Sequence, residues 1–217
     1  MGGRDPYSNS KGCAELVTAA YRDSFFPSGS IDRHGVALAS ARAGNAIGGG
    51  DWTNNQLIPD LVRAFMARRP CLIRNPAAIR PWQFVLEPLR GYLILAEKLL
   101  ESGGAFASGW NFGPAQEDAM PVAWIADELV RAWGDQASWA QDPADHPHEA
   151  HYLQLETSKA RQYLGWRPLL PLKSGLIWIV EWYRALQDGD DVKELTREQI
   201  ARYEALALTD VSTITAM

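Results

Sequence analysis

A tyrosine and a lysine lie four positions apart near the start of the chain, in the segment Tyr7-Ser8-Asn9-Ser10-Lys11. In a helix, residues at this spacing share a face, so the Lys11 ammonium can lie beside the Tyr7 phenol. A nearby positive charge favours the ionised phenol, and an ionised phenol can act as a general base. The spacing alone also fits a surface tyrosine beside a solvated lysine. The chemistry therefore depends on the elements that surround the pair.

The pair falls in the first turns of a predicted helix. Asp5 is a candidate N-cap, Pro6 suits the first helical position, and the segment 27–30 ends the helix. The pattern predicts an amphipathic helix over residues 6–26 with a buried apolar stripe. The stripe comprises Cys13, Leu16, Val17, Ala20, Tyr21 and Phe25.

The next segments alternate between strand and helix patterns. The apolar run 35–42 is typical of a strand buried on both faces of a parallel sheet. A glycine-rich loop follows at 44–52, and a helix is predicted on the apolar residues between Leu57 and Met66. This alternation indicates an α/β fold.

The second half has the same character with less regular spacing. Strands are predicted at 71–73, at 80–86 and from Trp110 into a turn at 113–114. A helix is expected to begin at Pro88 and end at 103–104. Further helices are predicted at 122–133, 158–164 with Ser158 as cap and Gly165 as stop, 172–186 and 196–206.

Composition narrows the class of protein. The chain has 217 residues, is 47% hydrophobic and has a net charge of −5. No apolar stretch is long enough to span a membrane, and no run of basic residues suits nucleic acid, so we expect a protein that binds neither. The sequence shows no signal peptide and has two cysteines, so we expect a cytoplasmic protein. Cys13 and Cys71 are too few for a disulfide framework or a four-cysteine zinc site.

A histidine cluster at 146–151 raises the question of a metal site. The segment His148-Glu149-Ala150-His151 is one residue too short for the zinc-peptidase pattern His-Glu-x-x-His. We therefore expect no metal.

Several ordered segments resemble the extended short-chain dehydrogenase/reductases and, more narrowly, the CDP-glucose 4,6-dehydratases. The Tyr-x-x-x-Lys segment is one of them, and Asn111-Phe112-Gly113-Pro114 is another. The full set lies at 5–15, 41–52, 80–89, 111–114, 148–153 and 164–168. Together these segments cover most of the chain to about residue 190.

The resemblance implies a domain organisation. Residues 1–60 would be the last part of a Rossmann-like NAD-binding domain, in which the parallel sheet is incomplete. Residues 61–190 would be mainly a small mixed α/β nucleotide-sugar-binding domain, with segments that return to the Rossmann-like sheet, and 191–217 would be a polar tail. The family's Gly-x-x-Gly-x-x-Gly turn, which holds the cofactor pyrophosphate, is absent from this sequence, and Gly48-Gly49-Gly50 has the wrong spacing to replace it. We therefore expect a C-terminal portion that is inactive alone.

The resemblance also implies an activity, that of a hydro-lyase in deoxysugar biosynthesis for O-antigen lipopolysaccharide. Such enzymes use NAD to convert CDP-glucose to CDP-4-keto-6-deoxyglucose by oxidation at C4, loss of water and return of hydride to C6. Tyr7 would take the proton from the sugar 4-hydroxyl, and Lys11 would hold the nicotinamide ribose. The residues that run the elimination would lie outside this chain, and the full-length protein would be a homodimer.

Three residues match substrate contacts of the family. Asn45 and Arg80 would lie beside the sugar diphosphate, and Asn111 would lie near the nucleotide. A loop at 142–147 would also lie near the nucleotide, where His148 or His151 would contact phosphate. Arg80 suits this role because a guanidinium donates two parallel hydrogen bonds. Asn45 and Asn111 can equally form turns, and Arg80 can equally form a surface ion pair.

The remaining signals leave alternatives open. Trp52 and Trp82 would either flank the ligand or belong to the core. Phe84 stands where we expect histidine in relatives, and Asn55-Gln56 stands where we expect Asp-Arg, so polar contacts are lost there. Two other functions fit the sequence: an NAD-dependent nucleotide-sugar epimerase or reductase, and a non-catalytic remnant that binds only a nucleotide sugar or a partner protein.

Overall fold

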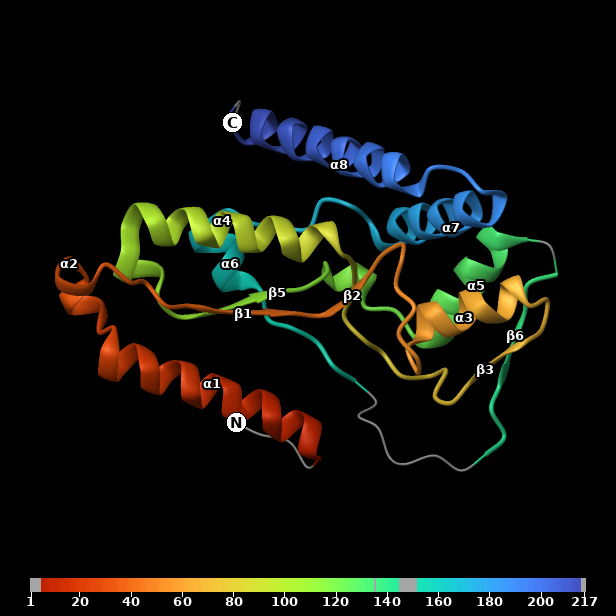
Figure 1. Cartoon of the computed structure of the whole chain (residues 1–217), viewed down its shortest axis with the longest axis horizontal. Coiled ribbons are helices and arrows are strands. Elements are labelled where there is room, and N and C mark those ends of the chain that lie inside the picture. Colours follow the sequence, from red (N-terminus) through yellow and green to blue (C-terminus); the bar gives the residue numbers. More distant parts are fainter. Residues whose placement is uncertain (1–4, 135, 145–151, 216–217) are drawn as a thin grey trace. The chain divides into compact units, whose positions relative to one another are not determined.

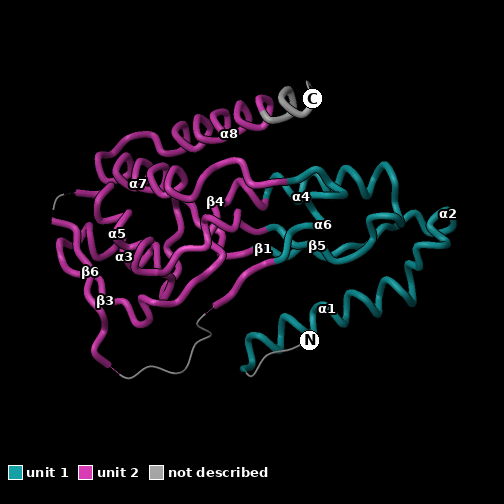
Figure 2. Tube along the Cα trace, turned by 180° about the vertical axis from the view of Figure 1, so that it is seen from behind, with its two compact units in different colours: residues 1–43, 89–112, 156–166 teal, residues 44–88, 113–155, 167–217 magenta. Residues whose placement is uncertain are grey.

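A computed structural model describes residues 5–134, 136–144 and 152–215, with side chains up to residue 209. The chain folds into two compact units, each built from three segments (Figures 1 and 2). The first unit comprises Met1–Ala43, Leu89–Phe112 and Glu156–Trp166, and the second comprises Gly44–Pro88, Gly113–Leu155 and Arg167–Met217. The domain boundaries expected near residues 60 and 190 stay predictions.

The first unit is a two-stranded parallel sheet with helices on both faces. Strand β1 (Ser40–Ala43) pairs with β5 (Gly109–Phe112), so that Ser40 lies opposite Gly109 and Arg42 opposite Asn111. Helix α1 (Pro6–Phe25) lies on one side of this pair, and α4 (Leu86–Ser102) and α6 (Ser158–Leu164) lie on the other (Figure 1). Shorter helical segments are η1 (Ser28–Ser30), α2 (Ile31–His34) and η2 (Gly103–Phe106).

The core of the first unit lies between the sheet and the helices α4 and α6. Trp110 and Phe112 of β5 pack with Leu95 of α4 and with Leu164 of α6. The ring of Phe112 meets that of Trp166 edge-on, with centroids 5.1 Å apart. This face of the sheet is therefore apolar, and it is the face away from α1.

Helix α1 has the predicted bounds to within one residue. The Asp5 carboxylate accepts a hydrogen bond from the Ser8 backbone N–H at 2.9 Å, and Pro6 occupies the first helical position. The predicted buried stripe is wrong, because none of the residues of α1 is buried, and Leu16 and Phe25 are 58% and 63% exposed. The physical reason is that the face of α1 toward β1 carries Glu15, which bonds polar groups of the strand.

The strand predicted over residues 35–42 is also shorter and less buried than expected. Only Ser40–Ala43 form a strand, and each residue of it is partly or fully exposed. The alternation explains this result, since Ser40 and Arg42 direct polar side chains toward Glu15. A strand with one polar face is not buried on both sides.

The second unit contains two further strand pairs, both parallel. Strand β2 (Asn45–Ile47) pairs with β4 (Trp82–Phe84), and β3 (Cys71–Ile73) pairs with β6 (Trp139–Gln141). The helices are α3 (Leu57–Met66), α5 (Val122–Trp133), α7 (Leu172–Asp188) and α8 (Val192–Thr215), with a short η3 (Gln116–Asp118). The structure thus confirms the α/β class.

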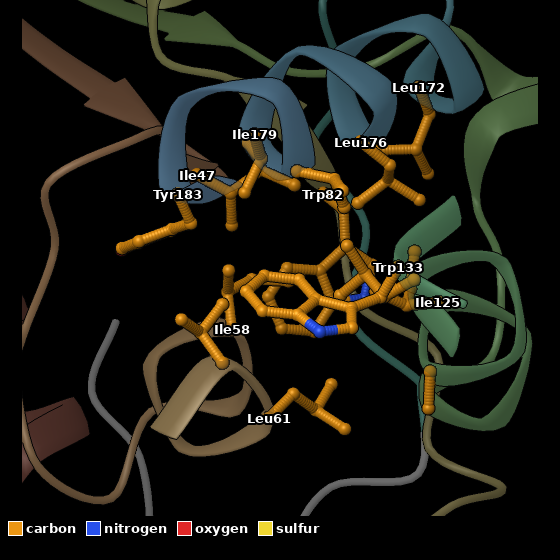
Figure 3. Close-up of a cluster of buried hydrophobic side chains, with 14 of the residues drawn as sticks. Ile47, Ile58, Leu61, Trp82, Ile125, Trp133, Leu172, Leu176, Ile179 and Tyr183 are labelled. Carbon is orange, nitrogen blue, oxygen red and sulfur yellow. The ribbon is translucent and has the colours of Figure 1, made fainter. Parts of the chain in front are cut away.

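The core of the second unit gathers side chains from its strands and helices (Figure 3). Leu61 of α3, Ile125 of α5 and Ile179 of α7 are fully buried there. Amphipathic spacing of these apolar residues predicted all three helices, and α5 has the expected bounds at both ends.

The sequence predicted α6 correctly but missed its N-cap and two of the short strands. Helix α6 has the predicted bounds, and Gly165 ends it at φ 63°. The expected Ser158 cap is wrong: the cap position is Thr157, and the Ser158 backbone N–H donates to the Glu156 carboxylate at 2.6 Å. Strands β2 and β6 were not predicted, because each is three residues long and lacks a period-two pattern of its own.

The glycine-rich loop after β2 is shaped by close packing. A Cβ at Gly49 would lie 2.3 Å from the Trp182 ring, and Gly50 has a φ of 79°. The Tyr183 hydroxyl donates to the Asp51 carbonyl at 2.6 Å. Glycine is needed here because α7 lies against the loop backbone.

Within the described part of the chain, no helix is long and apolar enough to cross a membrane. The same residues hold no group of three histidine, cysteine or acidic side chains that could bind a metal ion.

Candidate functional site

Tyr7 and Lys11 lie on one face of α1, as their spacing predicts. The Lys11 Nζ is 5.2 Å from the centroid of the Tyr7 ring. The Tyr7 side chain is 72% exposed, so its hydroxyl is accessible to a ligand. The two side chains can therefore act on the same reacting group.

Both residues border a cleft in the first unit, which we call the α1 cleft. It has a volume of about 850 Å³. Tyr7, Lys11, Glu15 and Thr18 line it from α1, and residues 38–43 line it from the chain that leads into and along β1. The cleft thus has the phenol and the ammonium on its α1 side, and small residues together with Leu38 and Arg42 on its other side.

A polar cluster within the lining of that cleft joins α1 to β1. The Arg42 Nε and Nη2 donate to the Glu15 carboxylate at 2.7 and 2.6 Å, and the Ser40 hydroxyl donates to it at 2.8 Å. These hydrogen bonds hold the pKa of Glu15 below its usual value, and the bonding by Arg42 has the largest effect. The same pairing raises the pKa of Arg42, so this ion pair stays charged at neutral pH.

Asn111 belongs to this cluster. Its side-chain oxygen accepts from the Arg42 Nη1 at 3.0 Å, and its side-chain nitrogen donates to the Glu156 carbonyl at 2.9 Å. The predicted nucleotide contact of Asn111 stays a prediction, since the side chain is engaged within the protein. The spacing of 69 residues between Arg42 and Asn111 left no sequence signal for their contact.

Asn45 and Arg80 meet in a cavity of the second unit, which we call the Asn45–Arg80 cavity. Its volume is about 210 Å³. Pairing of β2 with β4 brings the two residues together, and the Asn45 backbone N–H donates to the Pro81 carbonyl at 2.8 Å. The Arg80 Nη1 donates to the Ile79 carbonyl at 3.0 Å. The remaining lining includes Asn55, Asp60, Cys71, Arg74, Asn75 and Trp82.

The charge of this cavity suits an anion. Arg80 and Arg74 both line it, and the lining acid Asp60 is paired with Arg63 of the same helix. Asparagine side chains at 45, 55 and 75 add amide donors. The cavity can therefore bind phosphate oxygens through several donors.

Trp52 and Trp82, which the sequence left between a ligand contact and a core position, lie in different surroundings. Trp82 is 6% exposed, belongs to the core of the second unit and also lines the Asn45–Arg80 cavity. Trp52 is exposed and meets the Tyr183 ring edge-on, with centroids 5.2 Å apart. Phe84 is buried against Trp178, so an apolar contact replaces the polar one expected at that position.

His148, the fourth predicted substrate contact, lies outside the described residues, as do His146 and His151. Sequence reasoning missed Glu15 and Arg42. Their signal was available in part, because Glu15 continues the four-residue spacing of Tyr7 and Lys11.

Comparison with known proteins finds similarity to nucleotide-sugar 4,6-dehydratases, as the motifs do. Over 203 residues, or 94% of its length, the chain is 54% identical to CDP-glucose 4,6-dehydratase of Salmonella typhimurium, and it covers 56% of that protein. It is 25% identical to mouse dTDP-D-glucose 4,6-dehydratase, over 83% of this chain and 48% of the mouse protein. The chain thus spans about half the length of the curated relatives it matches. No family model matches it.

Solved structures show the fold. A dTDP-glucose 4,6-dehydratase of Streptomyces venezuelae with bound NAD superposes with a TM-score of 0.70 at 22% identity, over 88% of this chain and 54% of that one. A UDP-glucuronic acid 4-epimerase of Bacillus cereus with bound NAD gives 0.69 at 17% identity, over 84% of this chain and 53% of that one. These comparisons confirm the resemblance drawn from the motifs: the chain has the fold of nucleotide-sugar dehydratases and epimerases, and over nearly all of its length its sequence is similar to that of a CDP-glucose 4,6-dehydratase.

Proposed function

We propose that this chain carries the acid–base pair and part of the substrate site of a nucleotide-sugar 4,6-dehydratase that acts on CDP-glucose. The observation that carries the proposal is the meeting of Asn45 and Arg80 in one cationic cavity. The high sequence identity to the Salmonella enzyme supports dehydration over epimerisation and cytidine over other bases. We further propose a cytoplasmic protein that is a homodimer at full length and acts in deoxysugar biosynthesis.

In this proposal the diphosphate lies in the Asn45–Arg80 cavity. The guanidinium of Arg80 donates two parallel hydrogen bonds to phosphate oxygens, and the amide of Asn45 donates a third. Arg74 contributes further positive charge. Binding of the diphosphate fixes the sugar relative to the protein, which is a large part of what a catalyst must do.

Tyr7 and Lys11 perform the proton chemistry. Tyr7 takes the proton of the sugar 4-hydroxyl, and the Lys11 ammonium stabilises the phenolate that does so. NAD, when bound, would accept the hydride from C4 and return it at C6, so that none is consumed overall. The residues present fit only the nicotinamide end of NAD. The Tyr7 hydroxyl and the Lys11 ammonium lie on one helix face and border a cleft of about 850 Å³. Lys11 would donate a hydrogen bond to the nicotinamide ribose.

A binding experiment tests the substrate half of the proposal. Titration of the chain with CDP-glucose in a calorimeter should give saturable binding that is tighter than with dTDP-glucose. Arg80→Lys should weaken it tenfold or more, because an ammonium cannot make the paired hydrogen bonds of a guanidinium. Arg69→Lys is the matched control, since Arg69 is an exposed arginine of the same unit outside the cavity lining. Equal binding by the Arg80 variant and the wild type would refute the assignment.

An activity experiment tests the chemistry. The chain is fused to the part of the Salmonella dehydratase that it does not match, and products from CDP-glucose are identified by mass spectrometry. A dehydratase gives a product lighter by one water, whereas an epimerase gives an isomer of unchanged mass. Tyr7→Phe should lower kcat by at least a hundredfold, because it removes the general base. A fusion that binds CDP-glucose but yields no product would favour the non-catalytic remnant.

A further inference from the structure

Helix α1 is attached to the sheet with little burial of apolar side chains. Its six predicted core residues are all exposed, and no side chain of α1 is buried in the part of the chain that the structure describes. Hydrophobic burial, which normally fixes a helix to its sheet, therefore contributes little here.

A set of polar bonds takes the place of that burial. The Glu15 carboxylate, with its side chain 22% exposed, accepts three hydrogen bonds, from the Ser40 hydroxyl and from Nε and Nη2 of Arg42. A bidentate guanidinium–carboxylate pair is directional, so it fixes orientation as well as distance.

Strand β5 provides both a hydrogen-bond acceptor and space for the Arg42 guanidinium. Its third nitrogen, Nη1, donates to the side-chain oxygen of Asn111, the residue directly opposite on β5. Two residues earlier on the same face, position 109 is a glycine, and a Cβ there would lie 2.3 Å from Nη2 and 3.0 Å from Cζ of Arg42. Gly109 thus leaves the space that the guanidinium occupies.

Glu15 lies on the same face of α1 as the reactive pair. Tyr7, Lys11 and Glu15 follow one another at intervals of four residues, and all three line the α1 cleft. Fixing Glu15 to β1 therefore sets the rotation of α1 about its own axis, and this rotation decides where Tyr7 and Lys11 point.

We propose that Glu15, Arg42, Ser40 and Gly109 form a clamp whose role is to position Tyr7 and Lys11 over the α1 cleft. The proposal rests on the proposed function for the identity of the reactive pair. Glu15 and Arg42 are positioning residues, because they act on the reaction through α1. Arg42 thereby has a role distinct from that of Asn45, which follows it by three residues at the start of β2.

Hydrogen–deuterium exchange on the chain tests the clamp without any need for activity. Glu15→Gln should raise the exchange rate of amides in α1 at least tenfold, with little change in the second unit. Gly109→Ala should have the same effect on α1 although residue 109 is on β5, because its methyl group displaces the guanidinium. Asp23→Asn is the matched control on the same helix, since Asp23 is exposed, pairs with Arg22 and lies outside the lining of the α1 cleft. Unchanged α1 exchange in both clamp variants would overturn the proposal.

The pH dependence of that exchange adds a readout specific to Glu15. Its carboxylate faces Arg42 of β1 and Arg22 of α1, and Lys159 of α6 lies close enough to sense both arginines. Because the pKa of Glu15 is lowered in the folded state, the clamp is complete above the usual carboxyl pKa and is lost as pH falls through the lowered value. Protection of α1, corrected for intrinsic exchange, should follow this profile in the wild type and be flat in Glu15→Gln. A wild type without that step would contradict the clamp.

A kinetic readout separates positioning from mere stability. In the fused enzyme described above, Glu15→Gln should lower kcat at least tenfold while leaving the KM for CDP-glucose within about twofold, because the Asn45–Arg80 cavity is unaltered. Faster α1 exchange with an unchanged kcat would overturn the positioning role. If the wild-type fusion is inactive, the proposed function fails, and the exchange data still decide whether the clamp exists.

Discussion

The two cysteines occupy opposite environments. Cys71 is buried in β3 at the Asn45–Arg80 cavity, and burial raises the pKa of its thiol to about 11, whereas Cys13 is exposed on α1. The reactive form of cysteine is the thiolate, which Cys71 scarcely populates at neutral pH.

Alkylation therefore distinguishes the two thiols. Treatment of the folded chain with iodoacetamide at neutral pH should label Cys13 and leave Cys71 unlabelled, as read by peptide mass spectrometry. Labelling in denaturant should modify both and serves as the control. Equal labelling rates in the folded protein would show that β3 does not shield Cys71 as described.

Phe84 departs from the family pattern, and its side chain packs in the core instead of making a polar contact. A histidine was expected at this position, and the structure places the phenylalanine in the core, where its ring meets Trp178 edge-on at 5.5 Å. A buried histidine would need hydrogen-bond partners for both ring nitrogens, and a phenylalanine needs none. The change therefore favours packing of α7 on β4 over a polar contact.

At the scale of elements, α1 and α4 contact opposite faces of the same strand pair by different means. Helix α4 packs Leu95 against Trp110 and Phe112, while α1 contributes Glu15 to Ser40 and Arg42. Alternation along a strand sends neighbouring residues to opposite faces, so β5 presents Asn111 to one side and Phe112 to the other. Amphipathic spacing identified both helices but could not show which side of α1 contacts the sheet.

Close packing of α4 on β5 yields a prediction in which two effects compete. Alanine in place of Gly91 favours the helix by about 1 kcal/mol. Its methyl group would lie 2.3 Å from the fully buried ring of Phe112. Such overpacking costs about 1–3 kcal/mol and should prevail, so Gly91→Ala should lower the stability of the first unit in urea unfolding.

Gly29→Ala is the control for this comparison. Nothing lies within 4 Å of a Cβ at Gly29, and its φ is not positive. Its effect should stay within about 0.5 kcal/mol. If Gly91→Ala proves stabilising, helix propensity outweighs the contact with Phe112, and α4 packs less tightly than described.

At the scale of the whole molecule, each unit has its own hydrophobic cluster. The cluster of the first unit centres on Trp110, Phe112 and Trp166, and that of the second includes Leu61 and Ile179. No residue is shared between the two clusters. Unfolding of such a chain need not follow a two-state transition.

Hydrogen exchange measured at increasing urea should therefore show two transitions. Phe112→Ala should destabilise peptides of the first unit by about 3–5 kcal/mol, and Leu61→Ala those of the second by about 2–5 kcal/mol. Each variant should leave the other unit's midpoint nearly unchanged. A single transition that both variants shift equally would show that the two units unfold as one.

The sequence by itself determined the parts of this protein that depend on local spacing. Caps, glycine stops and apolar periodicity predicted α1, α5 and α6 nearly to the residue, and the four-residue spacing placed Tyr7 and Lys11 on one face. The order of the motifs also pointed to the family resemblance that comparison confirms.

Only the tertiary structure decided which surfaces of these elements meet. It brought Asn45 to Arg80 through pairing of β2 with β4. It also brought Arg42 to both Glu15 and Asn111 across gaps of tens of residues. It also left the apolar stripe of α1 exposed. The reason is physical. Periodicity shows that a helix has an apolar face, but contacts between segments far apart in the sequence decide what that face packs against. Short strands and single polar side chains make such contacts without any periodic signal in the sequence.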